Sequence, residues 1–507
     1  MDQSWWFVIA LGIYLATMAG IGWYGWHKTR EYDEYMIGGR GLHPFVAALS
    51  AGASDMSGWL LMGLPGAIYL SGLNQTWIAL GLIIGAWLNW RFTAPRLRSY
   101  TKIARNSITV PSFLENRLHD RSQLLRVAAG IIILLFFTFY VSSGMVAGGR
   151  YWESAFGGDY LTGLTLVAVV TVSYTLFGGF LAVSYTDAVQ GVIMFLALLL
   201  VPTAGIIYLV NQGQDATSIF SFAATNPYPG SEGQPVAGFF DPFSGTTFLA
   251  TVGLLGWGLG YFGQPHIIVR FMALRSAKDA AQGRRWGIGW QILCMLGAVM
   301  VALTATVFFA TNPNASVTDA QSYETIFLDM TRVLFHPLVA GLVLTAVLAA
   351  IMSTISSQLL VSSSALIEDL FKATVNKSLR PATYMLLSRI SVGVVALIAA
   401  VIAANPNSSI LGLVGFAWAG FGAAFGPVLL ASLYWNRLNV PGAASGMITG
   451  AVVSFVWGMS PLTDIIYEIV PGFVAASVVM ILVTRMTSAP TAAIRAEFEQ
   501  AVAEASK

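Results

Sequence analysis

The chain has 507 residues, of which 56% are hydrophobic and only 10% are charged, and its formal net charge is +2. Because about a quarter of the residues in a soluble domain are charged, this composition excludes an ordinary soluble protein and predicts an all-α polytopic membrane protein. The small net charge carries no information about partners, and no nucleic-acid partner is expected. The single cysteine, Cys294, excludes an intrachain disulfide and a thiol pair that could bind a metal.

Thirteen hydrophobic windows follow one another along the chain, and each is predicted to be a membrane-spanning helix, for which roughly 20 residues suffice. They fall at 5–26, 43–71, 75–90, 127–147, 161–183, 188–210, 247–268, 288–310, 337–364, 383–404, 410–435, 443–459 and 468–485. The first window has neither a basic segment before it nor a small-residue cleavage site, so it is interpreted as a retained helix and not as a signal peptide.

Lysines and arginines are distributed unevenly between the connections of these windows. Alternate connections hold 24 of the 26, and only Arg150 and Arg332 fall in the others. Because cytoplasmic loops are enriched in basic residues, the pattern predicts an external N-terminus and a cytoplasmic C-terminus. The connection 211–245, rich in Gly, Pro, Ser and Asn, is predicted to be an irregular external loop. The tail after Ala489, with Ile494, Phe498 and Val502 among charged residues, could form a short cytoplasmic helix, but its weakly amphipathic spacing favours a solvated segment.

The second window carries polar residues in its middle. The stretch Ser50–Trp59 contains Asp55, three serines and two glycines. A carboxylate at this depth costs about 3 kcal/mol on insertion scales, so it must have a partner. The stretch therefore predicts a helix interrupted at Gly52–Gly58 with a functional carboxylate; a structural carboxylate tied to a neighbouring helix is the alternative.

The seventh window is predicted to be interrupted as well. Five glycines and a proline fall between Gly253 and Pro265, and they weaken a continuous helix. Because the two windows lie five spans apart, they begin on opposite sides of the membrane, as in the inverted repeats of transporters. Glycines that permit close helix packing are the alternative. Trp257, Tyr261 and Pro265 lie close to one helical face, where the aromatic rings could contact a solute or belong to ordinary packing.

Small polar residues cluster in the ninth window. Ala350, Ser353, Thr354 and Ser357 recur at helical spacings of three and four. Hydroxyl and carbonyl oxygens suit a hard cation such as Na+, whereas membrane serines and threonines also bond to their own helix. Tyr140, at the end of an apolar run, is open to a functional or an interfacial interpretation. Asp187 is predicted to open the sixth window, with Gln190 three residues later, as a helix cap or a functional carboxylate.

Three stretches carry a resemblance to a known family: Leu49–Gly66, Gly256–His266 and Ala417–Pro427. They resemble the sodium/solute symporter family, and the first is specific to the branch of that family that transports proline. The resemblance extends over essentially all thirteen windows. It implies a leucine-transporter-like fold with two inverted repeats of five helices. The expected divisions are an extra helix and cytoplasmic loop at 1–42, the first repeat at 43–210, an external loop at 211–246, the second repeat at 247–435, and two further helices with the tail at 436–507.

The resemblance also implies the residues of the site. Na+ would lie between the second and ninth windows, bound by the carbonyls of Ala53, Met56 and Ala350 and the hydroxyls of Ser353 and Thr354, with Asp55 required for coupling. The proline pocket would be lined by Ser57, Gly58, Tyr140, Trp257, Tyr261 and Pro265. Supporting roles would fall to Arg40, Ser50, Ser54, Asp187, Thr345 and Ser357. Thr345 and Ser357 stand where related members are expected to have Ser and Cys, and both replacements are small and polar.

The expected function is Na+-coupled import of L-proline by alternating access, in a bacterial inner membrane and without enzymatic activity. Beyond the two cargoes and the lipid bilayer, no obligate protein partner is expected. One alternative keeps the fold and changes the solute to another small carboxylate or a vitamin. A channel, or a membrane sensor without turnover, is the other alternative, and the absence of a kinase-like cytoplasmic domain argues against the sensor.

Overall fold

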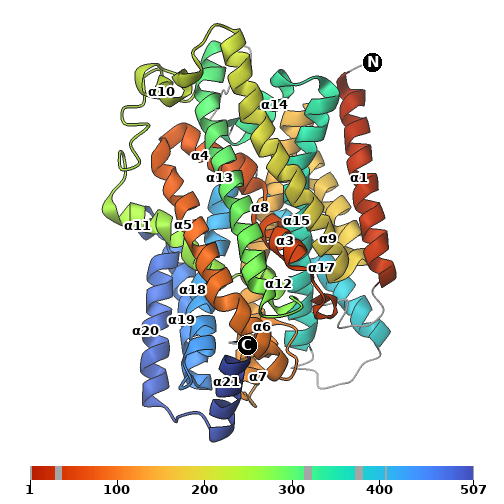
Figure 1. The fold of residues 1–507 in the computed structure, drawn as a ribbon, viewed down its shortest axis with the longest axis vertical. Coiled ribbons are helices and arrows are strands. Elements are labelled where there is room, and N and C mark those ends of the chain that lie inside the picture. The colour runs from red at the N-terminus through yellow and green to blue at the C-terminus, as the bar shows by residue number, and fades with distance from the viewer. Residues whose placement is uncertain (1–2, 29–36, 313–321, 372–380, 406–407, 506–507) are drawn as a thin grey trace.

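The computed structural model describes residues 3–28, 37–312, 322–371, 381–405 and 408–505. These residues form a bundle of long helices, and the two ends of the chain lie at opposite ends of the bundle (Figure 1). Five of the basic residues behind the orientation prediction lie outside the described residues: Arg30, Lys372, Lys377, Arg380 and Lys507.

The helices follow the chain in a regular order. They are α1 Gln3–Lys28, α3 Pro44–Asp55, α4 Leu64–Ser71, α5 Thr76–Leu88, α6 Ala94–Ile103, α7 Val110–Leu118, α8 Leu124–Phe156, α9 Tyr160–Asn211, α10 Phe222–Thr225, α11 Phe248–Gly256, α12 Pro265–Met272, α13 Asp279–Thr311, α14 Ile326–Leu334, α15 Pro337–Ser364, α17 Pro381–Ala403, α18 Ile410–Tyr434, α19 Val440–Gly458, α20 Ile469–Met486 and α21 Ala492–Ala505. Short 3-10 or π turns join some of them: η1 Gly38–Arg40, η2 Trp59–Gly63, η3 Leu73–Gln75, η4 Asn89–Thr93, η5 Ala216–Phe220, η6 Trp257–Phe262, η7 Ser322–Thr325, η8 Ala365–Phe371 and η9 Pro461–Asp464.

Every predicted window falls on helix in the described part of the chain. Nine helices there are long and apolar enough to cross a membrane, and the bent pair α3 and α4 makes ten. Two shorter apolar helices, Tyr160–Ser173 and Phe248–Phe262, match the fifth and seventh windows. The fifth and sixth windows are separated inside α9 by Gly179, whose φ of 62° and ψ of 179° are accessible essentially to glycine alone. The prediction of an all-helical polytopic membrane protein is confirmed.

Both predicted helix interruptions are present. The second window bends by 62° between Asp55 and Trp59, and in the seventh window the chain leaves η6 and restarts helically at Pro265. Gly52, however, lies inside α3, so the predicted start of the first break is wrong. A Cβ on Gly52 would stand 2.4 Å from the Trp290 ring, so this glycine permits close packing of α3 against α13 instead of breaking the helix.

The C-terminal tail differs from its prediction. Residues 492–505 form helix α21, whose apolar side chains Ile494, Phe498 and Ala501 are buried. Phe498 packs edge-on against Tyr100 of α6, and Glu497 lies 2.9 Å from His119 after α7. The short-helix interpretation is therefore confirmed and the prediction of a solvated tail is wrong, because the apolar residues of this helix pack against α6 and the segment after α7.

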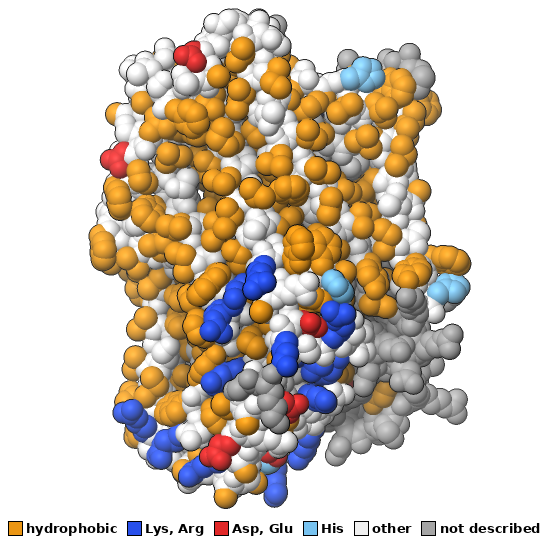
Figure 2. Space-filling view, viewed as in Figure 1, with side chains coloured by type: hydrophobic (Ala, Val, Ile, Leu, Met, Phe, Trp, Pro, Cys, Tyr) orange, Lys and Arg blue, Asp and Glu red, His pale blue; other side chains and the backbone are white. Residues whose placement is uncertain are grey.

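Charge and apolar surface are separated along the bundle. Figure 2 shows hydrophobic side chains covering the upper and middle parts of the visible face, while Lys and Arg gather on its lower part. The C-terminus lies at that lower, basic end (Figure 1). This separation is typical of a protein embedded in a bilayer with one basic rim.

Candidate functional site

Asp55 lies at the end of α3, where the helix breaks and its last carbonyls have no partner inside the helix. Its side chain is 1% exposed, and Oδ2 accepts a hydrogen bond from the Tyr261 hydroxyl. Its carbonyl accepts from Trp59 Nε1 at 3.0 Å and from the Tyr140 hydroxyl at 3.2 Å. Oδ1 is buried and has no hydrogen-bond partner among the described residues. The break thus exposes a carboxylate oxygen to the interior of the bundle.

Tyr261 belongs to the second break and is held from two sides. Gln291 of α13 donates to its hydroxyl at 3.0 Å, and Asn89 donates to its carbonyl at 2.8 Å. The ring meets Trp418 edge-on at 5.1 Å. Neither Gln291 nor Asn89 is in the predicted site. Each is an amide residue inside an apolar window, and this could have marked it as a candidate.

Aromatic rings surround the two breaks. Trp257 stacks on Tyr467 at 5.1 Å between centroids and lies 6.3 Å from Trp59. Trp418 donates from Nε1 to the Trp257 carbonyl at 2.7 Å, which fixes the unwound segment. Trp257 therefore packs on both sides, and the structure gives weight to the packing interpretation as well as to solute contact. Tyr467, at the edge of the last predicted window, is absent from the predicted site.

Oxygen atoms of α3 and α15 converge beside the first break. Ser353 Oγ lies 2.8 Å from the Ala53 carbonyl and 3.0 Å from the Ala350 carbonyl. Thr354 Oγ1, one residue further along α15, is buried and has no partner within the described ranges. Met56 lies in the break and is fully buried. Carbonyl and hydroxyl oxygens without a nitrogen or sulfur ligand fit a hard cation, so the donor set suits Na+.

Other predicted pocket residues pack close to these atoms. Ser57 and Gly58 follow Met56 in the break and are buried. A Cβ on Gly58 would stand 2.8 Å from Cβ of Ala147, so α8 and the break approach at glycine distance. Pro265 is the first residue of α12, a position at which proline's missing N–H has no helical role.

Asp187 takes part in a second polar cluster, on the basic side of the first. Its Oδ2 accepts from Ser50 Oγ at 2.8 Å and from Arg270 Nη2 at 3.0 Å. Arg270 also donates to Ser357 Oγ at 2.7 Å and to the His266 carbonyl. Asp187 lies eight residues inside the second part of α9, so its predicted role as a helix cap is wrong. Arg270, which was counted in the connection after the seventh window, lies in α12 and is 1% exposed.

The remaining predicted residues have hydrogen bonds to other groups. Thr345 bonds back to Leu342 at 2.6 Å, and Ser54 bonds back to Ala51 at 3.2 Å. Arg40 is bound to Thr101, Asn106, the Ser107 carbonyl and the Met272 carbonyl. Arg40 thus ties the end of α12 to the connection between α6 and α7.

Two buried side chains outside the prediction have unused polar atoms. The described residues offer no hydrogen-bond partner to the amide of Gln358 or to either ring nitrogen of His266. Since buried polar groups are almost always paired, these positions are candidates for contact with water, ion or solute. Gln358 ends the predicted polar stretch of α15, and His266 follows Pro265.

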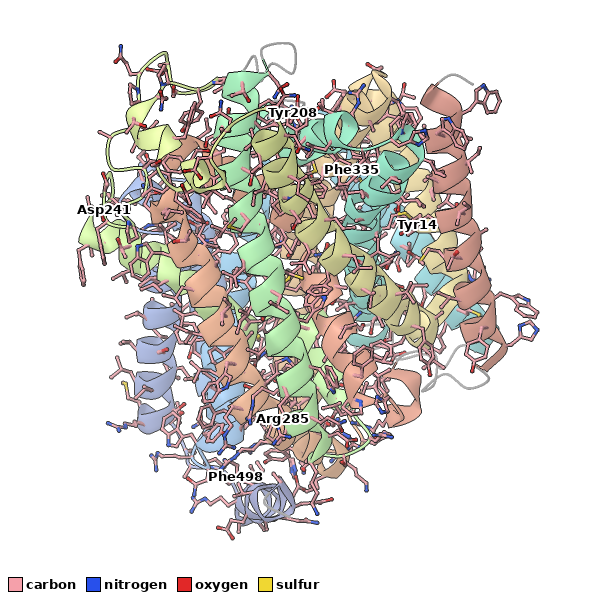
Figure 3. All side chains as sticks on the ribbon, turned by 45° about the horizontal axis from the view of Figure 1, so that its top comes forward. Tyr14, Tyr208, Asp241, Arg285, Phe335 and Phe498 are labelled. Carbon is pink, nitrogen blue, oxygen red and sulfur yellow. The ribbon has the colours of Figure 1, made fainter. Side chains whose placement is uncertain are left out.

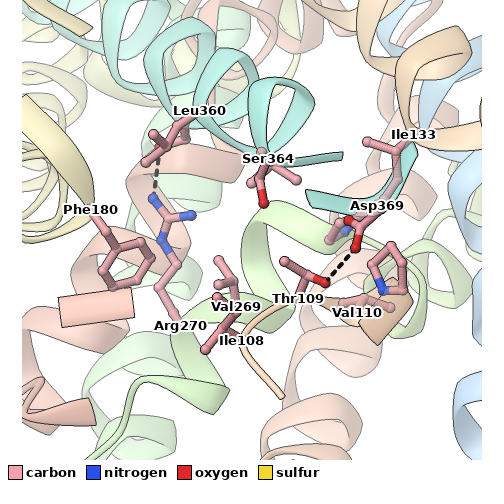
Figure 4. Close-up of a pocket in the computed structure, with 14 residues that line it drawn as sticks. Ile108, Thr109, Val110, Ile133, Phe180, Val269, Arg270, Leu360, Ser364 and Asp369 are labelled. Carbon is pink, nitrogen blue, oxygen red and sulfur yellow. Dashed lines mark hydrogen bonds between the residues drawn. The ribbon is translucent and has the colours of Figure 1, made fainter. Parts of the chain in front are cut away.

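A small cavity lies next to the second cluster (Figure 4). Arg270 and Phe180 line it on one side, and Thr109, Val110 and Asp369 line it on the other. Ser357 and Pro265 also belong to its lining. Its volume is about 30 Å³, far below the roughly 300 Å³ at which ligand pockets begin. The cavity has room for water molecules but not for an amino acid.

Comparison with known proteins identifies the family to which the chain belongs. A model of the sodium:solute symporter family matches residues 35–450. The chain belongs to this family. The High-affinity proline transporter PutP of Bacillus subtilis is 50% identical over 478 residues, which cover 94% of this chain and 98% of that protein. The Sodium/proline symporter of Salmonella typhimurium is 46% identical, covering 97% and 96% of the two chains. The expected family resemblance is confirmed.

Solved structures define the fold of this family member. The substrate-bound outward-open structure of a Na+-coupled sialic acid symporter superposes with a TM-score of 0.78 at 19% identity, covering 97% of this chain and all of the other. At this identity the match carries the fold alone. The leucine-transporter-like prediction is confirmed.

Proposed function

We propose that this chain couples the inward movement of Na+ to the uptake of L-proline across a bacterial inner membrane. Support comes from the relatives of 46% to 50% identity, which are named proline transporters or sodium/proline symporters. The observation that carries the proposal is the buried break at Asp55. There, one carboxylate oxygen has no hydrogen-bond partner among the described residues. Two residues earlier in α3, the Ala53 carbonyl accepts a hydrogen bond from Ser353 of α15, which also bonds to the Ala350 carbonyl.

The proposed Na+ site consists of the carbonyls of Ala53, Met56 and Ala350 with the hydroxyls of Ser353 and Thr354. Without the ion, the Ser353 hydroxyl hydrogen lies between Oγ and the carbonyls of Ala53 and Ala350. Bound Na+ would replace this hydrogen bonding, because a lone pair of Ser353 Oγ and both carbonyl oxygens can then face the cation. Asp55 would supply the negative charge that keeps the site favourable for a cation. Its hydrogen bond from Tyr261 and the one its carbonyl accepts from Tyr140 would then connect the ion site to the proline pocket.

The proline pocket is proposed to comprise Ser57, Gly58, Tyr140, Trp257, Tyr261 and Pro265. Na+ bound at the break would fix the backbone at Ser57 and Gly58, so ion and solute would strengthen each other's binding reciprocally. Each Na+ carried inward gains about 2.3 kcal/mol per 100 mV of inside-negative potential. Arg40, Ser50, Ser54, Asp187, Thr345 and Ser357 are proposed to support this cycle from outside the two binding sites.

We propose an external N-terminus and a cytoplasmic C-terminus, supported by the basic end at which the chain finishes (Figures 1 and 2). The proposed divisions are 1–42, the repeat 43–210, the external loop 211–246, the repeat 247–435 and the final part 436–507. The two helix breaks support this division, since each lies in the first helix of its proposed repeat.

The test measures labelled-proline uptake into membrane vesicles with and without an inward Na+ gradient. Wild type should take up proline only with the gradient, and Asp55→Cys should abolish the Na+-stimulated part while inserting normally. Asp464→Cys, which removes an exposed carboxylate, serves as the matched control. Full Na+-stimulated uptake by Asp55→Cys would refute the assignment.

Competition separates proline from the alternative solutes. A panel of small carboxylates and vitamins at excess should leave labelled-proline uptake unchanged unless the competitor is the true cargo. The relatives are transporters, and we propose that this chain likewise catalyses no covalent reaction. Na+ current without solute in reconstituted protein would favour a channel.

A further inference from the structure

Three arginines at the basic end of the bundle form a cluster without carboxylate partners. Arg91 lies in η4, and Arg284 and Arg285 lie near the start of α13; Arg284 is within electrostatic range of the other two. None of the three has a hydrogen bond or ion pair to another described residue. Like charges held together repel, and a bound anion would reduce that repulsion.

The packing of Trp90 explains why these arginines lie together. Trp90 is buried against Gly283 and Gly287 of α13, where a Cβ on Gly283 would stand 2.6 Å from the ring. Arg91 follows Trp90 in the sequence, and Arg284 follows Gly283. This packing therefore brings the two arginines to the same part of the surface. Their position is fixed by a buried ring and a close approach, so the cluster is preformed.

Aromatic side chains surround the cluster. The Arg284 guanidinium carbon lies 5.6 Å from the centre of the Trp87 ring, and that of Arg91 lies 5.6 Å from the Phe92 ring. Trp87 is 42% exposed, and Trp286 beside Arg285 is 51% exposed. Exposed tryptophans next to arginines are typical of the boundary between hydrocarbon and headgroups. Figure 3 places Arg285 at the lower end of α13, and Figure 2 shows basic side chains there below the apolar surface.

An exposed apolar strip leads away from the cluster along the two helices. On α5 it comprises Leu80 and Ile84, and on α13 it comprises Ile292, Leu293 and Leu296. The two helices run in opposite directions and contact each other. At a rise of 1.5 Å per residue, the strip extends roughly 10 to 16 Å from the arginines toward the middle of the membrane. A molecule that fits both parts has an anionic head and long apolar chains.

We infer that Arg91, Arg284 and Arg285 bind the phosphate of an anionic phospholipid from the leaflet at the basic end of the bundle, with its acyl chains along α5 and α13. The lipid joins two helices that also hold Tyr261. Asn89, two residues before Arg91, donates to the Tyr261 carbonyl, and Gln291, six residues after Arg285, donates to its hydroxyl. A bound lipid therefore stabilises the elements that position Tyr261 against Asp55.

Native mass spectrometry of the purified full chain tests this site with phosphatidylglycerol and phosphatidylcholine as probes. Wild type should retain phosphatidylglycerol in preference to phosphatidylcholine. Since a basic residue near an anionic membrane contributes about 1 kcal/mol, or about fivefold in affinity, replacing all three arginines by glutamine should weaken this binding on the order of a hundredfold. Arg285→Gln alone, at an exposed position, should weaken it about fivefold and guards against misfolding of the triple variant.

The matched control replaces the exposed Arg121, Arg437 and Arg485 by glutamine, which removes the same charge from the same end. It should keep phosphatidylglycerol binding within about twofold of wild type. Equal losses in both triple variants would overturn the site, because they would show diffuse attraction. Unchanged binding in Arg285→Gln, or equally tight binding of glycerol phosphate without acyl chains, would overturn it as well.

Discussion

Tyr261 donates the hydrogen of its hydroxyl to the Asp55 carboxylate, across 206 positions of sequence. Gln291 donates to the same phenolic oxygen, so the tyrosine's own hydrogen is directed toward Asp55. The bond joins the two helix breaks to each other. Any event that changes the charge around Asp55, including the arrival of a cation, is therefore communicated directly to the second break.

Tyr261→Phe should weaken the response to Na+ while the protein still folds. The variant loses one hydrogen bond to a charged group, which contributes about 1.5 to 3 kcal/mol, so half-saturation should need roughly 10 to 100 times more Na+. The measurement is proline uptake over a range of Na+ concentrations. Tyr434→Phe, which loses a bond to the Phe92 carbonyl at an exposed position, is the control. An unchanged Na+ dependence would exclude this role for the hydroxyl.

Ser353→Ala should lower the affinity for Na+ more than that for proline. Its hydroxyl is the atom that lies between carbonyls of α3 and α15, and loss of one neutral ligand should cost about 1 kcal/mol, or about fivefold. Binding of both cargoes to purified protein can be measured by calorimetry. Ser432→Ala, which removes a bond within α18, should leave both affinities unchanged. A larger loss for proline than for Na+ would place Ser353 in the pocket.

Sequence patterns predicted the fold and both helix breaks because each leaves a local signal. Long apolar windows predict the helices, and Asp55 with its neighbouring serines predicts the first break. The partners of these residues could not be predicted in the same way, since Gln291 and Asn89 meet Tyr261 only through tertiary packing. Family resemblance supplied the set of ligands, which apolar periodicity does not specify.

The wrong predictions have physical causes. Arg270 was counted among the basic residues of a connection, yet it lies in α12 and is buried, with Asp187, Ser50 and Ser357 around it. Weak amphipathicity in the tail was taken as solvation, yet α21 has a surface to pack against. A helix cap was one of two interpretations of Asp187, because Gln190 follows three residues later, but the helix begins earlier, after Gly179. For Arg270 and α21, residues distant in sequence decide the environment.

Phe498→Ala should destabilise the basic end of the protein, where α21 packs. The ring contacts Tyr100 and lies 5.1 Å from the Arg117 guanidinium carbon, so its removal leaves a cavity under α21 that should cost about 3 kcal/mol. Thermal unfolding of the detergent-solubilised chain should begin at a lower temperature. Glu499→Ala, at an exposed position of the same helix, is the control. Equal stability of the two variants would contradict the packed position of α21.

The pair Arg270 and Asp187 should show strong coupling in a double-mutant cycle. Both side chains are buried, and Arg270 Nη2 lies 3.0 Å from Asp187 Oδ2. Removing one partner of such a pair leaves an uncompensated charge that costs about 3 to 5 kcal/mol. Arg270→Met and Asp187→Leu should therefore each lower thermal stability sharply, while the double variant should recover most of the loss, because no unpaired charge remains. The exposed pair Arg275 and Asp279, at 3.2 Å, is the control and should couple by less than about 1 kcal/mol. Additive losses in the buried pair would mean that water or other groups, and not each other, balance the two charges.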